Sequence, residues 1–223
     1  MKTVLKALGI YFLFVLLPLF LALVVGILTS KTEVYDTTDL AEYGHILGDG
    51  YEYDQLVQAD LDAYFPAAID PAWEDVRYHY HAEDNTFWSS ICHEIDLEFV
   101  IPDQAAFDAY VATVAPIEAF RPFPYDEAFL EYAHKDTYIS IDYEQDEQTG
   151  EKHAEYFDPV YIKETLIAPS ERRVVIVAVR AEDASPVEAA DWFFRRFDID
   201  VTDYALDLQK IDPKRAFVNK AAP

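Results

Sequence analysis

Residues 76–101 read VRYHYHAEDNTFWSSICHEIDLEFVI, and this pattern predicts a β-hairpin. Polar and apolar residues alternate over 76–82 and over 87–101, as in strands that bury one face. A two-residue turn at Asp84-Asn85 brings the apolar faces of both strands onto the same side of the sheet. This agreement favours the pairing, because a slip of one residue would turn the aromatic face to solvent.

The segments beyond the hairpin extend the pattern to a complete domain. Six consecutive apolar residues, Val174 to Val179, predict a central strand that is buried on both faces. Periodicity and capping residues predict helices at 53–64, 103–114, 126–133 and from 186 onward, and strands at 137–144, 161–168 and 172–181. We therefore expect an α+β fold: a mainly antiparallel, twisted sheet of about five or six strands with helices packed on one face.

The N-terminal residues form the longest apolar run of the chain. No charged residue occurs from Ala7 to Thr29, and about 20 apolar residues in a helix span the core of a bilayer. A cleaved signal peptide is the alternative, but its apolar region usually covers only about 7 to 15 residues and ends at a small-x-small cleavage site. The sequence from Gly26 to Lys31 contains no Ala-x-Ala, so we expect an uncleaved signal anchor.

Flanking charges predict the orientation of this anchor. Lys2 and Lys6 precede it without an acidic residue, whereas Glu33 and Asp36 follow soon after Lys31. By the positive-inside rule, the N-terminus faces the cytoplasm and the C-terminal domain lies outside the cell membrane. The expected organisation is a cytoplasmic N-terminus (1–6), a single-pass transmembrane signal anchor (7–29), a linker (30–36), an extracytoplasmic α+β domain (37–199) and a C-terminal tail (200–223).

The chain is strongly acidic, with 42 Asp and Glu residues against 17 Lys and Arg residues and a formal net charge of −25. This charge argues against nucleic acid as a partner, because affinity for phosphate chains comes from Lys and Arg. It allows a cation or a basic protein as a partner of the acidic surface, although the same charge also keeps an exported domain soluble. The single cysteine allows no internal disulfide, which fits an exported bacterial domain stabilised by packing.

Three histidines in the predicted hairpin raise the question of a zinc site. His79 and His81 have the His-x-His spacing that puts two imidazole rings on one face of a strand. In the predicted register they lie opposite Ser90 and Trp88, while His93 points to the apolar face. We therefore expect a surface histidine pair and one core histidine. A site of two histidines, completed by an acid from elsewhere, stays open as an alternative.

Glu94, Asp96 and Glu98 form an acidic stripe along one face of the second strand. Hard cations bind where several carboxylate oxygens converge, but a solvated face is the interpretation we prefer for such a stripe. We therefore assign no residue to catalysis, to a cofactor or to a metal. His79, His81 and the three acids remain the candidate metal ligands.

Short catalytic motifs are absent from the sequence, including nucleophile elbows, zinc-protease helices, phosphate loops and dinucleotide fingerprints. Cys92 lacks neighbours that stabilise a thiolate, and we expect a buried or semi-buried thiol. The leading hypothesis is a non-catalytic, membrane-anchored extracytoplasmic domain that binds or supports a partner at the cell envelope. One alternative is a metal-dependent or thiol hydrolase that uses His79 and His81 with nearby carboxylates or Cys92. Another is that the transmembrane helix, residues 7–29, is the main interaction element.

Overall fold

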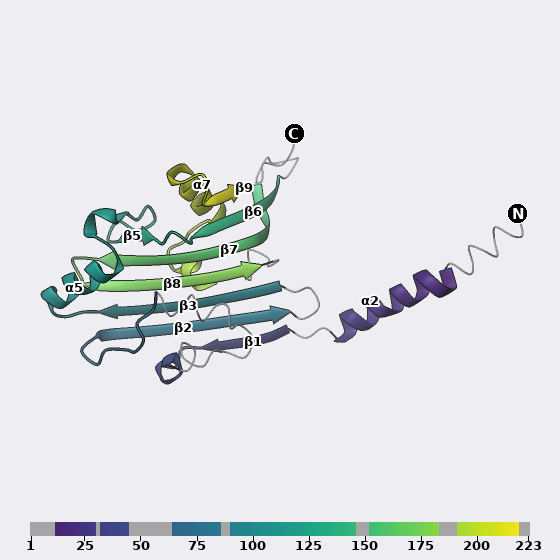
Figure 1. Ribbon diagram of the computed structural model, residues 1–223, viewed down its shortest axis with the longest axis horizontal. Helices are drawn as coiled ribbons and strands as arrows, with labels where there is room; N and C mark the ends of the chain where they lie inside the picture. The colour runs from purple at the N-terminus through teal and green to yellow at the C-terminus, as the bar shows by residue number, and fades with distance from the viewer. Residues whose placement is uncertain are drawn as a thin grey trace, which may run out of the picture.

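The computed structural model describes residues 12–29, 32–44, 64–85, 90–145, 152–182 and 191–218. These residues form an α+β fold around one nine-stranded sheet, which is antiparallel except where β9 joins β6 (Figure 1). The strands are β1 (Thr32–Thr37), β2 (Glu74–Asn85), β3 (Ser90–Val100), β4 (Arg121–Pro122), β5 (Leu130–Ala133), β6 (Tyr138–Gln145), β7 (Lys152–Ala168), β8 (Arg173–Glu182) and β9 (Ala216–Val218).

Strand β8 lies in the middle of the sheet, whose main order is β1-β2-β3-β8-β7-β5-β4, with β6 pairing β7 and β9 pairing β6. The residues from Val174 to Val179 on β8 are all buried, which confirms that this apolar run forms a central strand. The mainly antiparallel α+β class is also confirmed. The sheet has more strands than the sequence predicts, because short strands such as β4 and β9 contain too few residues for an alternation to be recognised.

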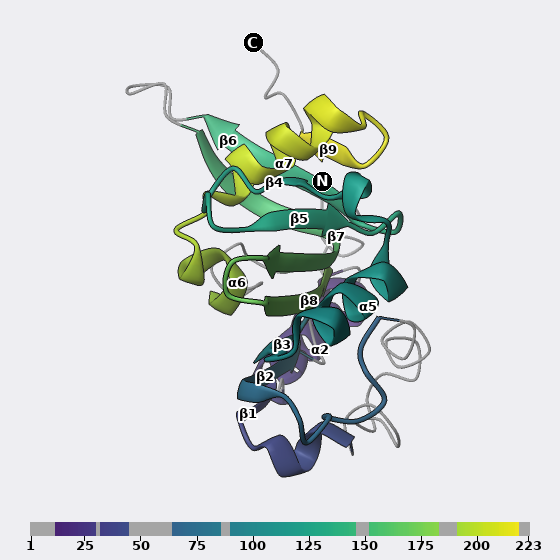
Figure 2. The ribbon, with the colours of Figure 1, turned by 90° about the vertical axis from the view of Figure 1, so that its left-hand side faces the viewer.

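Helices cover both faces of the sheet, although the sequence predicts them on one. α5 (Gln104–Val114) lies on one side and α6 (Asp191–Arg196) on the other (Figure 2). α7 (Val201–Ile211) packs into the same core as α6. The reason lies in β8, whose apolar side chains alternate between the two faces, so that each face needs its own cover.

Each face carries a separate hydrophobic core. The core on the α5 side is rich in aromatic side chains from β2, β3 and α5, among them Tyr78, Tyr80, Phe99 and Phe107, and it also contains Leu97 and Val111. The core on the α6 side combines aliphatic side chains of β7 and β8 with aromatic side chains of α6 and α7, among them Ile162, Leu166, Val177, Phe193, Phe197 and Tyr204. Asp103 caps α5 as predicted, its carboxylate accepting a hydrogen bond from the Ala106 N–H at 2.8 Å.

The predicted hairpin is present as β2 and β3, but its register differs. Tyr80 lies opposite Ile95, six residues further along β3 than the predicted partner Ser89. The predicted turn residues Asp84 and Asn85 are paired within the ladder, and residues 86–89 lie outside the described part. A shift of six is even, so every side chain keeps its predicted face, while its neighbours across the strands change.

Two segments add strands where the sequence predicts other structures. Residues 30–36 are predicted as a linker, but Thr32–Thr37 form β1, which pairs with β2. Residues 126–133 are predicted as a short helix, but Leu130–Ala133 form β5, which pairs with β4 and β7. In both segments the local sequence has only a weak preference for the predicted structure, and pairing with a neighbouring strand outweighs it.

The described residues 200–218 belong to the domain, although the sequence predicts a tail over 200–223. α7 buries Tyr204, Ala205 and Leu208 against the sheet, and β9 extends it. Polar residues surround these three positions in the sequence, so the apolar stripe of the helix is too narrow to be recognised from periodicity. The start of the helix predicted from 186 lies outside the described residues, as does nearly all of the helix predicted over 53–64.

A π-helical turn (Phe12–Leu16) and α2 (Leu17–Thr29) form an N-terminal helix that stands apart from the sheet (Figure 1). Its apolar side chains face outward: Phe14 is 70 % exposed and Leu19 is 63 % exposed. Among the described residues, no helix combines the length and the apolar character needed to cross a membrane. Residues 7–11 of the predicted span lie outside the described part.

Phe99 tests the packing of the α5-side core. It is fully buried, stacked on Trp73 at 3.8 Å between ring centroids and in edge contact with Tyr110. Phe99→Ala should lower the free energy of unfolding by about 3–5 kcal/mol, because it leaves a cavity between these rings. Urea denaturation followed by tryptophan fluorescence measures the change. Val34→Ala on the exposed face of β1 is the control and should shift it by less than about 0.5 kcal/mol; equal effects would contradict the described core.

Candidate metal centre

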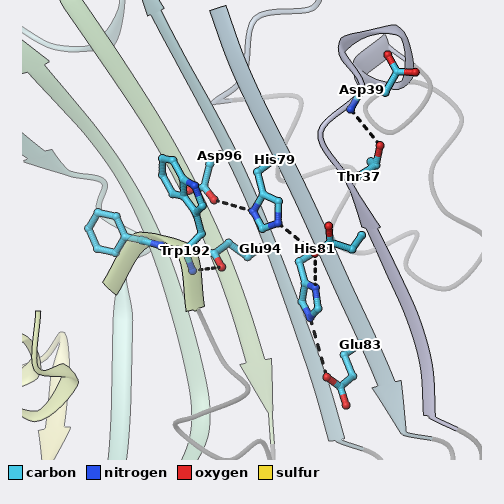
Figure 3. Close-up of polar contacts among 10 residues, drawn as sticks. Thr37, Asp39, His79, His81, Glu83, Glu94, Asp96 and Trp192 are labelled. Carbon is cyan, nitrogen blue, oxygen red and sulfur yellow. Dashed lines mark hydrogen bonds and ion pairs between the residues drawn. The ribbon is translucent and has the colours of Figure 1, made fainter. Parts of the chain in front are cut away.

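The register of β2 and β3 brings histidines and acids face to face (Figure 3). His79 lies opposite Asp96, and His81 lies opposite Glu94. All four side chains are on the α6 side of the sheet, because the tyrosines that alternate with the histidines fill the other core. The sequence predicts this face correctly, but its register hides the contact between the histidines and the acids.

Asp36, on the edge strand β1, holds both histidine rings. Its Oδ2 atom lies 3.2 Å from Nε2 of His79 and 3.1 Å from Nδ1 of His81. A carboxylate only accepts hydrogen bonds, so each of these two nitrogens carries the hydrogen. In a neutral His79 ring, Nδ1 is then left with a free lone pair. Partial burial opposes ionisation of Asp36, but the two rings outweigh it and lower its pKa.

Glu94 is buried and fastens the start of α6 to the sheet. Its Oε1 accepts a hydrogen bond from the Phe193 N–H at 2.9 Å, and its Oε2 accepts one from the Trp192 N–H at 3.2 Å. Burial and the neighbouring Asp96 raise the pKa of Glu94 to about 8, although the two backbone bonds act in the opposite direction. A carboxylate has about four lone-pair sites, so each oxygen keeps capacity for a further partner.

Asp96 is the least satisfied group of the cluster. Its side chain is only 2 % exposed, and neither oxygen has a hydrogen-bond partner within the part of the chain that the structure describes. Burial raises its pKa well above the ordinary value. Oδ2 of Asp96 lies 3.6 Å from Nδ1 of His79, which is too far for a hydrogen bond, and this nitrogen is likewise buried without one.

His79, Glu94 and Asp96 offer ligand atoms that all lie within 4.8 Å of one another. In a tetrahedral shell with bonds of about 2.1 Å, ligand atoms lie about 3.4 Å apart, so the side chains must close by up to about 1.4 Å to bring all three ligand atoms into one coordination shell. Imidazole nitrogen and carboxylate oxygen are both ligands of Zn²⁺. The donor set therefore fits a divalent transition metal.

Two of the five sequence candidates do not join this cluster. Glu98 binds the guanidinium groups of Arg173 and Arg196. Burial opposes its ionisation, but the two arginines outweigh burial and lower the pKa of Glu98. His81 contacts Asp36 and comes within 4.0 Å of Glu83, on the outer side of the cluster. The His79–His81 pair considered from the sequence is therefore divided between the cluster and its edge.

The prediction of a solvated acidic face is wrong, because all three acids of β3 are buried. Backbone N–H groups of α6 compensate Glu94, and arginines compensate Glu98. The sequence contains one signal for this compensation: Arg196 lies in the last turn of the Phe-rich helix α6. Asp36 and Trp192, in contrast, come from distant segments, and no spacing in the sequence connects them with the hairpin.

The predictions for Cys92 and His93 are confirmed. Cys92 is a buried thiol in the core on the α6 side. His93 is buried on the opposite side, with its ring centroid 6.5 Å from that of Tyr80. Neither residue contributes to the cluster of His79, Glu94 and Asp96.

A second pair of buried acids lies under α7. Glu131 on β5 binds Arg121 at 2.8 Å, and Glu164 on β7 accepts a hydrogen bond from the Tyr204 hydroxyl. Burial and the neighbouring Glu131 raise the pKa of Glu164 to about 8. Burial also raises the pKa of Glu131, against the effect of Arg121. Glu164 therefore keeps its proton to a higher pH than an exposed glutamate does.

The chain matches no protein-family model, no curated protein and no solved structure. The assignment of a function to the cluster therefore depends on its geometry and chemistry.

Glu164 predicts a specific dependence of stability on pH. In the unfolded chain this carboxyl loses its proton near its ordinary pKa of 4.5, but the folded protein keeps the proton up to about pH 8. The folded state binds more protons across this window, so the contribution of Glu164 to the free energy of unfolding falls as pH rises from about 4.5 to 8. Glu164→Gln removes this contribution and should flatten the pH dependence, as measured by urea denaturation with a chelator present.

Glu118→Gln, at an exposed position, serves as the matched control. Its stability curve should run parallel to that of the wild type. A Glu164→Gln curve that is also parallel would show that the folded protein does not retain this proton.

Proposed function

We propose that the protein is a membrane-tethered, extracytoplasmic domain that binds a divalent metal ion through His79, Glu94 and Asp96. The proposal depends on two buried groups that face each other. Nδ1 of His79 and Oδ2 of Asp96 lie 3.6 Å apart, and neither has a hydrogen-bond partner among the described residues. A buried polar group without a partner costs about 1–3 kcal/mol, and a cation between these two atoms satisfies both.

A proton shared by Glu94 and Asp96 is the competing explanation. It neutralises the two carboxyl groups but leaves Nδ1 of His79 without a partner, whereas a metal ion satisfies all three groups. Asp36 adds a second argument. By accepting the Nε2–H of His79, it holds the ring in the tautomer whose Nδ1 lone pair faces the acids, and metal-bound histidines commonly have such a carboxylate behind them.

One nitrogen and two oxygen ligands suit Zn²⁺ and its transition-metal neighbours. At a given site of this kind, Zn²⁺ generally binds more tightly than Mn²⁺ or Fe²⁺, so Zn²⁺ is the ion with which to test the site. Three protein ligands leave the fourth position of a tetrahedral shell open to water or another ligand.

The N-terminal segment supports the membrane tether. Its residues from Ala7 to Thr29 carry no charge, and its helical part exposes large apolar side chains such as Phe14 and Phe20. Lipid is the solvent that suits such a surface. The lysines before the segment and the acids after it favour a domain outside the membrane.

Binding, rather than hydrolysis by a thiol, is the better use of this site. Cys92 is buried among apolar side chains, where neither substrate nor base reaches it easily. An interaction through residues 7–29 alone would leave the buried cluster without a role.

Zinc titration of the chelator-treated full chain in detergent tests the metal site. Wild type should bind one Zn²⁺ per chain. His79→Ala and Asp96→Asn should each weaken binding by at least about tenfold, because each removes a ligand. Asp36→Asn should weaken it as well, by about tenfold or more, through loss of the support behind His79. Calorimetry gives both stoichiometry and affinity.

His81→Ala is the matched control, because His81 is on the same strand and face but outside the cluster. It should change the affinity by less than about threefold. Circular dichroism verifies that each variant is folded. Unchanged affinity in folded His79→Ala and Asp96→Asn proteins would overturn the proposed site.

The tether makes its own prediction in cells. A chain with a C-terminal epitope tag should stay in the membrane fraction after alkaline carbonate extraction, because an apolar span is not removed by salt or base. The tag should be digested by protease added to intact cells without a wall. An unrelated apolar helix in place of residues 7–29 should preserve both results. Release of the tagged domain into the medium, or digestion only after lysis, would contradict the tether or its orientation.

A further inference from the structure

A pocket of about 390 Å³ opens beside the metal-binding cluster. Two of the three proposed ligands, His79 and Asp96, lie in its wall together with Trp192. Figure 3 shows these three side chains close to one another. The Trp192 and His79 rings are 6.4 Å apart between centroids. The volume is within the range of about 300–1,000 Å³ that is common for small-molecule sites, so an ion in the cluster would be accessible to a ligand.

Arg77 stands in the same wall and has no acidic partner among the described residues. Its register partner on β3 is Glu98, but Glu98 is bound by Arg173 and Arg196. Arg77 forms no ion pair with any residue that the structure describes. In a chain of net charge −25, an arginine in a pocket that pairs with none of the described acids favours an anionic ligand.

The remaining wall of the pocket is mainly apolar. Leu40, Val76 and the indole of Trp192 contribute to it, and Thr38 adds a hydroxyl group. A phosphate group alone would leave these surfaces without a contact. An organic acid has a carboxylate for the cationic groups and a hydrocarbon or aromatic body for the apolar wall.

We propose that this pocket binds an organic carboxylate, a proposal that rests on the metal site proposed above. One carboxylate oxygen occupies the open position of the metal, the guanidinium of Arg77 binds the carboxylate, and the apolar body lies against Trp192 and Leu40. The metal and Arg77 supply the attraction for the negative charge, and Trp192 supplies the selectivity for an apolar acid.

Cobalt spectroscopy of the full chain in detergent tests this proposal. Co²⁺ replaces Zn²⁺ in such sites, and its visible absorption responds to a new ligand in the coordination shell. Benzoate is the probe, with neutral benzamide as its isosteric control and inorganic phosphate as the competing anion. We expect benzoate to change the spectrum with saturation, benzamide to leave it unchanged, and phosphate to require a higher concentration than benzoate.

Arg77→Gln should weaken benzoate binding by about tenfold while changing Co²⁺ affinity by less than about threefold. Arg195→Gln is the matched control, because Arg195 is an exposed arginine of α6 that does not line the pocket. It should leave both affinities unchanged.

The outcomes separate the two proposals. If Co²⁺ does not bind, the proposed metal site fails, and the anion site fails with it. If Co²⁺ binds but benzoate leaves the spectrum unchanged, only the anion site is overturned. Stronger binding of phosphate than of benzoate overturns the ligand class, and equal benzoate affinity in Arg77→Gln overturns the role of Arg77.

Discussion

The pairing of His79 with Asp96 across β2 and β3 is the contact on which the rest of the site depends. It sets a buried imidazole nitrogen against a buried carboxylate in the wall of the pocket. Edge strand β1 contributes Asp36 behind the histidine, and α6 contributes Trp192 beside it. Side chains from three segments far apart in the sequence thus lie around the His79–Asp96 pair. A different register of β2 and β3 would separate the candidate ligands.

The buried acids of β3 are stabilised in three different ways. Glu94 receives the first N–H groups of α6, and Glu98 receives two arginines. Asp96, between them, receives neither among the described residues. Burying a carboxylate is costly unless it is paired or bonded, so this middle position is where an added cation contributes most. The same logic explains why burial raises the pKa of Glu164 under α7.

Local periodicity predicts on which face of a strand a side chain lies, and the structural features that follow from this face are predicted correctly. The period of two in 76–82 and the apolar run on β8 predict the hairpin, the central strand and the side of the sheet on which the histidines lie. Register is different, because a shift by six residues leaves every face unchanged and turns the partner of His79 from Ser90 into Asp96. The burial of Asp96, and the approach of Asp36 and Trp192, follow from long-range packing that no local pattern contains.

An anomalous-difference map from crystals of the full chain grown with Zn²⁺ tests the central claim most directly. The account predicts one strong peak about 2.0–2.2 Å from Nδ1 of His79 and from carboxylate oxygens of Glu94 and Asp96, with Nε2 of His79 still bound to Asp36. It is contradicted if zinc appears only at His81 and other surface positions while the density between His79 and Asp96 holds no ion.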